Sequence, residues 1–175
     1  MAKIAVVYYS LKGETIAPGM KIVNLEKGHT AAAAEFIEQA VGGDLMELET
    51  VKTYNPDHRK MIYEAKEELD KGIRPALKAC PDIRGYDVIF LGFPNWWNTL
   101  PMPVVTFLEQ CSWDGKKIIP FVTSGGSGFG RSLEDLKKYA PGAQILPGGE
   151  FLGHEVERSE ASISQWAKDA VKDSI

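Results

Sequence analysis

Continuous apolar runs alternate with amphipathic stretches along this chain, and this alternation limits its fold more than any other feature. The runs at 3–9, 86–93 and 117–123 are apolar on both faces, which is typical of strands buried in a parallel sheet. Segment 44–50 alternates apolar residues with acids and predicts an edge or near-edge strand. Segment 143–146 predicts a short fifth strand.

Amphipathic stretches with helical spacing separate these strands. They predict five helices, at 30–41, 57–71, 101–110, 130–139 and 159–172. A strand–helix alternation of this kind favours the α/β class, with a doubly wound parallel sheet and helices on both faces.

Size and composition indicate an ordinary globular protein. The 175 residues fit one domain covering 1–175, and 44% apolar with 25% charged residues excludes disorder and collagen-like repeats. The net charge is −4 and no long basic run occurs, which argues against nucleic acid as a partner. The apolar runs fall far short of the about 18 residues of a membrane span.

Two further features concern the cellular compartment. Only Cys80 and Cys111 occur, in no metal-binding or redox spacing, so we expect a reducing, cytoplasmic environment and no metal site. The first apolar run leads into Ser10 and Lys12 and not into a small-residue cleavage site. We therefore expect it to be a strand and not a signal peptide.

Two segments interrupt the alternation. Residues 11–27 separate the first strand from its helix, with an extended piece at 20–23, and residues 147–156 delay the last helix. Connections in α/β units usually have two to six residues. Both segments are either tolerated surface insertions or walls of a ligand site, because each follows the end of a strand.

The segments that follow the buried strands carry the candidate chemistry, because ligands of open α/β sheets bind outside the carboxyl ends of the strands. Ser10 follows the first strand, and 27–30 opens the first helix after the insertion. Residues 94–99 and 123–130 follow the next two buried strands. Together they offer hydroxyls, a helix N-terminus, an aromatic pair and a glycine-rich loop, which suit a ligand with a phosphate and a flat ring system.

The start of the first helix is the candidate phosphate site. Free N–H groups and the positive end of the helix dipole favour an anion there. Gly28 permits close approach of the backbone, and Ser10 and Thr30 add hydroxyls. The alternative is that Thr30 is only a helix cap and Gly28 only a turn residue.

The ring system has two candidate contacts. Trp96 and Trp97 follow a buried strand directly, and since successive residues point differently, at most one packs inward easily and the other is left to cover a planar ligand. The alternative is that the pair serves an interface, as in a homodimer. In the other loop, 123–126 offers N–H groups with little side-chain bulk, against which a ring edge can lie.

These motifs resemble the flavodoxin family, over nearly the whole chain. The resemblance rests on Tyr9-Ser10-Leu11-Lys12-Gly13-Glu14 with Lys27-Gly28-His29-Thr30, on Gly92-Phe93-Pro94-Asn95-Trp96-Trp97, and on Pro120-Phe121-Val122-Thr123-Ser124-Gly125-Gly126-Ser127. It is closest to bacterial flavodoxin-like flavoproteins with an insertion in the phosphate loop. It implies a five-stranded sheet of order 2-1-3-4-5 and FMN as the cofactor.

By the same resemblance, the first loop would bind the phosphate of FMN and the other two would border its isoalloxazine ring. The cofactor-binding residues predicted in this way are Ser10, Lys12, Gly28, His29, Thr30, Ala31, Pro94, Asn95, Trp96, Trp97, Asn98, Thr99, Thr123, Ser124, Gly125 and Gly126. No side chain is predicted to act as a general base, because the cofactor carries the reaction.

The chain departs from the family pattern at two places. His29 stands where the phosphate loop usually has asparagine, and the third loop lacks the aromatic ring that electron-carrier flavodoxins stack on the flavin. The more open ring face favours hydride exchange with NAD(P)H and a quinone or other small molecule. The remaining possibilities are electron transfer to a redox partner protein, and a binding module that has lost productive cofactor use.

Other functions are disfavoured by missing residues. Tyr8-Tyr9-Ser10 replaces the acids of a receiver domain, and no P-loop or Gly-x-Ser-x-Gly elbow occurs. We expect His154 and Glu155 to be loop residues near the ring edge. His58 and the acidic run within 64–70 are interpreted as solvated side chains on an exposed helix face.

Overall fold

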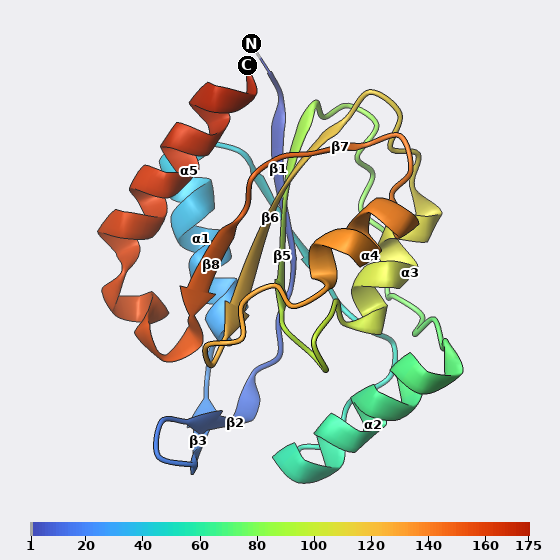
Figure 1. Ribbon diagram of the computed structural model, residues 1–175, viewed down its shortest axis with the longest axis vertical. Coiled ribbons are helices and arrows are strands. Elements are labelled where there is room, and N and C mark those ends of the chain that lie inside the picture. The colour runs from blue at the N-terminus through green and yellow to red at the C-terminus, as the bar shows by residue number, and fades with distance from the viewer. Residues whose placement is uncertain (1) are drawn as a thin grey trace.

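The computed structural model describes residues 2–175 as a parallel sheet with helices on both faces (Figure 1). The sheet strands are β1 (Ile4–Tyr9), β4 (Asp44–Leu48), β5 (Val88–Pro94), β6 (Lys117–Ser124), β7 (Gln144–Ile145) and β8 (Gly149–Leu152). The α-helices are α1 (His29–Val41), α2 (His58–Lys71), α3 (Met102–Gln110), α4 (Ser132–Tyr139) and α5 (Glu160–Ser174). A hairpin of β2 (Gly13–Ala17) and β3 (Lys21–Leu25) and a 3-10 helix, η1 (Gly153–Arg158), complete the chain. Within these described residues no helix is both long and apolar enough to cross a membrane.

The strand order is β4-β1-β5-β6-β7, and all pairings in this sheet are parallel. This confirms the predicted order 2-1-3-4-5 and the edge position of the strand that begins at Asp44. The five predicted helices are also present, with ends within two residues of those expected.

The fifth strand differs from the prediction because it has two parts. β7 pairs with the start of β6, and β8 pairs with its end, where Phe121 lies opposite Gly149 and Ser124 opposite Leu152. Pro147 between them has no N–H to donate to the sheet. Segment 147–156, which was expected to be a connection that delays the last helix, instead contains β8 and the start of η1. The short β8 is not a continuous apolar run and gave no strand signal.

Each central strand sends alternate side chains to two separate cores. Ile89, Leu91 and Phe93 of β5 lie in the core beneath α3 and α4, while Val88 and Phe90 lie in the core beneath α1 and α5. Figure 1 shows these two helix pairs on opposite sides of the sheet. Burial on both faces explains why the strand runs are apolar without alternation.

The parallel register brings three loops to one edge of the sheet. Tyr8 pairs with Gly92, and Pro94 pairs with Thr123, so β1, β5 and β6 end close together. The insertion 11–27 forms the β2–β3 hairpin, in which Thr15 pairs with Val23. Figure 1 shows this hairpin beyond the same edge, near one end of α2.

The packing of β5 against β6 depends on the absence of a side chain at Gly92. A Cβ added to Gly92 would lie 2.1 Å from Cζ of Phe121, which is fully buried, so Gly92→Ala forces the ring or the strand to shift. We expect a loss of about 1–3 kcal/mol in the free energy of unfolding, measured with urea. Gly85→Ala is the control, because its Cβ would meet only Lys3 Nζ at 3.7 Å. Equal stability of the two variants would contradict this account.

Candidate functional site

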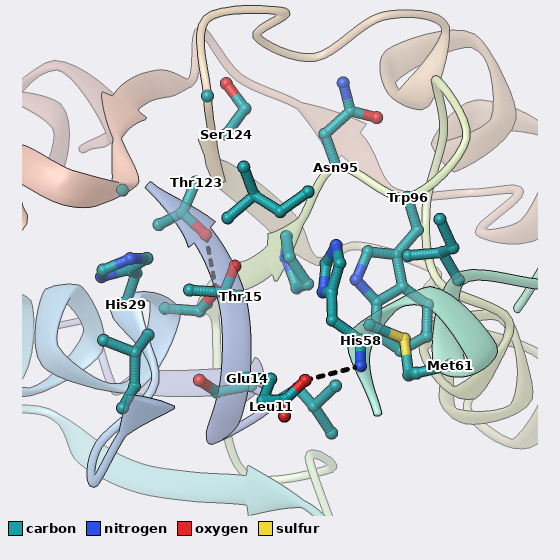
Figure 2. A pocket seen from close by; sticks show the side chains of 18 of the residues that line it. Leu11, Glu14, Thr15, His29, His58, Met61, Asn95, Trp96, Thr123 and Ser124 are labelled. Atoms are coloured by element: carbon teal, nitrogen blue, oxygen red, sulfur yellow. Dashed lines mark hydrogen bonds between the residues drawn. The ribbon is translucent and has the colours of Figure 1, made fainter. Parts of the chain in front are cut away.

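A cavity of about 330 Å³ lies where the three loops meet, within the size range of small-molecule sites (Figure 2). Its lining combines the loops after β1, β5 and β6 with the β2–β3 hairpin, α2 and η1. The lining residues are Ser10, Leu11, Glu14, Thr15, Ile16, Leu25, His29, Thr30, His58, Met61, Ile62, Ala65, Pro94, Asn95, Trp96, Trp97, Thr123, Ser124, Gly125, Gly153 and His154.

The structure brings most, but not all, of the predicted site residues together in this cavity. Ten of them line it, namely Ser10, His29, Thr30, Pro94, Asn95, Trp96, Trp97, Thr123, Ser124 and Gly125. Lys12, Gly28 and Ala31 line an adjoining second cavity of about 620 Å³. Asn98, Thr99 and Gly126 belong to neither lining.

Asn98 and Thr99 turn away from the cavity because the chain reverses at the preceding residues. Trp97 and Asn98 have φ values of 53° and 69°, in the left-handed region. The Asn98 carbonyl then accepts the N–H of Arg131, and the buried Thr99 hydroxyl donates to Asp135 of α4. Both residues are thus bonded to the start of α4.

The N-terminus of α1 is held by contacts with the other end of the insertion. Ser10 Oγ accepts the N–H of Ala31 at 3.1 Å. A Cβ at Gly28 would lie 2.2 Å from Ser10 Oγ and 2.7 Å from the Leu11 carbonyl, so only glycine fits this crossing. Gly28 contributes no side-chain cap, and the first turn contains no acid. First-turn N–H groups have no intrahelical partner, so this terminus favours an anion.

Two buried hydroxyls join α1 to β6 beside this terminus. Thr30 Oγ1 and Thr123 Oγ1 are 2.7 Å apart, and the two residues are only 2% and 4% exposed. A hydroxyl has one donor and two acceptor positions. The pair therefore keeps hydrogen-bonding capacity for a ligand in the cavity.

The histidine at the start of α1 is shielded from water. Burial lowers the pKa of His29 below its ordinary value of 6.5; His154 adds to this shift and Glu157 opposes it. A Cβ at Gly153 would lie 2.7 Å from His29 Cδ2, so η1 packs directly on the imidazole. Residues 153 and 154 thus form a wall of the cavity, and His154 is part of a 3-10 helix and not of a loop.

The two tryptophans point in different directions, as expected from the sequence. Trp96 packs edge-on against the rings of Tyr9 and Tyr54, with both centroid distances 5.4 Å. Trp97 stays 40% exposed, and its Nε1 donates to the carbonyl of Ile62 at 2.7 Å. Each indole is therefore fixed while lining the cavity.

The glycine-rich loop after β6 is ordered by one side chain. Ser124 Oγ accepts the N–H groups of Gly126 and Gly128, at 3.2 and 3.0 Å. Asn95 Nδ2 donates to Ser127 Oγ at 2.8 Å and joins this loop to the loop after β5. The two loops form one connected border, and the aromatic residue of the β6 loop, Phe129, is buried against Phe93 and does not line the cavity.

Two buried polar atoms in the cavity lining have no hydrogen-bond partner. They are Asn95 Oδ1 and His58 Nδ1. Buried polar groups are nearly always paired, so each such atom calls for an explanation. Together with the α1 terminus and the threonine hydroxyls, they fit a ligand that has an anionic end and a ring with polar edges.

The sequence interpretation of His58 was wrong. His58 is half-buried at the start of α2, lines the cavity, and donates its backbone N–H to Glu14 Oε2 of the hairpin at 3.0 Å. Glu14, Thr15, Ile16 and Leu25 also line the cavity, so the insertion forms one of its walls. No sequence signal connects residues 14 and 58, which lie in separate elements.

Glu68 in the acidic run was also misinterpreted as solvated. It is only 3% exposed and accepts hydrogen bonds from Tyr54 Oη at 2.6 Å and Lys52 Nζ at 2.9 Å. Burial and the neighbouring Tyr9 and Glu68 raise the pKa of Tyr54, so the phenol stays protonated. This network fixes the Tyr54 ring against which Trp96 packs.

Known proteins share this fold. The flavodoxin family model matches residues 22–170. A putative flavoprotein from Bacteroides eggerthii is 33% identical, with 98% of this chain and 99% of that chain covered and a TM-score of 0.75. A putative flavoprotein from Bacteroides uniformis is 31% identical, with 95% and 98% covered and the same TM-score. A flavoprotein from Lactobacillus acidophilus, solved in complex with FMN, is 23% identical, with 90% and 98% covered and a TM-score of 0.66. A search of curated proteins found no match.

Because His29 is shielded from water, we expect the free energy of unfolding of the ligand-free protein to depend on pH. Because the pKa of His29 is lowered in the folded chain, the unfolded chain takes up the proton first as the pH falls. The stability that the neutral imidazole contributes is present above pH 6.5 and is lost as the pH falls below it. We expect a shallower loss of unfolding free energy between pH 7.5 and 5 in His29→Gln than in the wild type. Parallel urea-denaturation profiles would contradict the burial argument.

Proposed function

Because this chain belongs to the flavodoxin family, we propose that it binds FMN in the cavity and carries electrons or hydride through the bound flavin. The observation that carries this proposal is the meeting of a helix N-terminus without an acid in its first turn, two buried hydroxyls and two loops around one cavity. The Lactobacillus acidophilus flavoprotein, which has the same fold, was solved with FMN and supports it.

The phosphate end of FMN would lie at the N-terminus of α1. The first-turn N–H groups and the helix dipole attract the anion, and the Ser10 and Thr30 hydroxyls lie beside them. No cationic side chain is required. His29 would face the phosphate in its neutral form, as a hydrogen-bonding group.

The ring would lie between the loops after β5 and β6. Trp96 and Trp97 offer aromatic surface, and the chain from Thr123 to Gly125 offers main-chain groups with little bulk. The indoles are held by the contacts of Trp96 with Tyr54 and of Trp97 with Ile62, so they would bind the ring without further ordering.

The bound flavin would supply the redox chemistry, while the chain would hold and orient the ring. Since the loop after β6 places no aromatic ring over the site, one face of the flavin would stay open to a second reactant. This favours NAD(P)H-dependent reduction of a quinone or similar small molecule over shielded electron transfer to a partner protein.

A charge reversal at Thr30 tests the phosphate site. Thr30→Glu places a carboxylate at the proposed anion position, and we expect FMN affinity to fall at least about 100-fold, measured by quenching of flavin fluorescence. Thr30→Ser keeps the hydroxyl and should bind FMN within a few-fold of the wild type. Circular dichroism of both variants checks the fold. Tight FMN binding by a folded Thr30→Glu protein would overturn the assignment.

A turnover assay tests whether the open ring face reacts with small molecules. We expect the FMN-loaded protein to oxidise NADH or NADPH and to reduce a soluble benzoquinone with a stoichiometry of one to one, followed by nicotinamide absorbance. Protein without FMN is the control. Tightly bound flavin that neither nucleotide reduces would contradict small-molecule reduction and favour an electron carrier.

A further inference from the structure

The imidazole of His58 has a buried ring nitrogen for which residues 2–175 provide no hydrogen-bond partner. It lines the cavity, and its Nδ1 is buried without a hydrogen-bond partner. Figure 2 shows the ring beside Trp96 and near Met61, on the side of the cavity away from His29. An unpaired buried polar atom is costly, so a ligand that pairs with it gains affinity.

The position of His58 is set from two sides. Its backbone N–H donates to Glu14 Oε2 of the hairpin at 3.0 Å, as the dashed line in Figure 2 shows. On its own helix, the preceding Asp57 caps α2 by accepting the N–H of Lys60 at 3.2 Å. The insertion and the helix cap together fix the residue from which the imidazole projects.

His58 also stands where the two cavities meet. Ser10, Leu11, Glu14, His58 and Met61 belong to both linings, so they form the partition between them. A ring that extends through the first cavity away from His29 would end beside His58 and Trp96, which lie next to each other in Figure 2. That end needs a polar partner, because the rim of an isoalloxazine carries carbonyl oxygens and ring nitrogens.

We propose that His58 is a flavin-binding residue, whose Nδ1 hydrogen-bonds to a polar atom of the isoalloxazine ring, and that the 11–27 insertion holds it there through Glu14. This inference rests on the proposed function. In this proposal the insertion positions the His58 side chain of α2 against the cofactor.

Replacement of the imidazole tests the contact. In His58→Leu the hydrogen bond is lost, and we expect the Kd for FMN to rise about tenfold, with a shift in the visible flavin spectrum. His58→Asn keeps an amide near the position of Nδ1 and should recover most of the affinity and the spectrum. Arg59→Ala, at the exposed next residue of the helix, is the matched control and should bind as the wild type does.

A phosphate measurement separates the ring contact from the anion site. Inorganic phosphate, titrated as a competitor of FMN, should have the same inhibition constant in His58→Leu and the wild type. Thr30→Glu should lose phosphate and FMN together. A His58→Leu protein that also loses phosphate has a disturbed fold around the cavity, which contradicts a local contact to the ring.

The role of the insertion is tested through Glu14. Glu14→Ala removes the acceptor for the His58 N–H, and we expect it to weaken FMN binding in the same direction as His58→Leu. If Glu14 acts through His58, the double variant should bind no worse than His58→Leu alone. Additive losses would contradict the positioning role.

The outcomes distinguish this inference from the proposed function. A wild-type protein that binds no FMN overturns both. Wild-type affinity and an unchanged spectrum in His58→Leu overturn the inference alone, even if turnover is lost, because His58 would then face the second reactant and not the flavin.

Discussion

The parallel register of β1, β5 and β6 is the constraint on which the rest of the structure depends. It ends the three strands at one edge of the sheet, with Tyr8 opposite Gly92 and Pro94 opposite Thr123. The close contact between β5 and β6 requires a residue without a side chain at 92, where Phe121 occupies the space. Segments separated by more than a hundred residues can share one cavity only because this register holds.

Local contacts convert that shared edge into a site. Gly28 lets the two ends of the insertion cross, so that Ser10 bonds to the first turn of α1. The hydroxyls of Thr30 and Thr123 join the helix to the far strand. On the other side of the cavity, the buried carboxylate of Glu68 holds the Tyr54 ring against which Trp96 packs. The cavity is therefore largely formed before any ligand enters, which reduces the ordering cost of binding.

The sequence was sufficient to predict the fold and the meeting of the loops after β1, β5 and β6 around one cavity. Runs such as the one at 88–93 give a clear strand signal because they are buried on both faces, and the loops after them could be placed by topology alone. What it could not supply were contacts between distant polar residues. Glutamate and histidine are usually exposed to solvent, so their types gave no sign that Glu68 and His58 are buried or half-buried. The hydrogen bonds of Glu68 to Tyr54 and of the His58 N–H to Glu14 are contacts between distant parts of the chain. The short β8 was missed because its pairing with β6, and not its composition, makes it a strand.

A crystal structure of the protein grown with excess FMN tests the central claim most directly. Our account predicts the phosphate within hydrogen-bonding distance of Ser10 Oγ and the first-turn N–H groups of α1, with the ring bordered by Trp96 and the chain from Thr123 to Gly125. It would be contradicted by crystals in which the protein's own side chains fill this edge of the sheet, or in which FMN binds elsewhere.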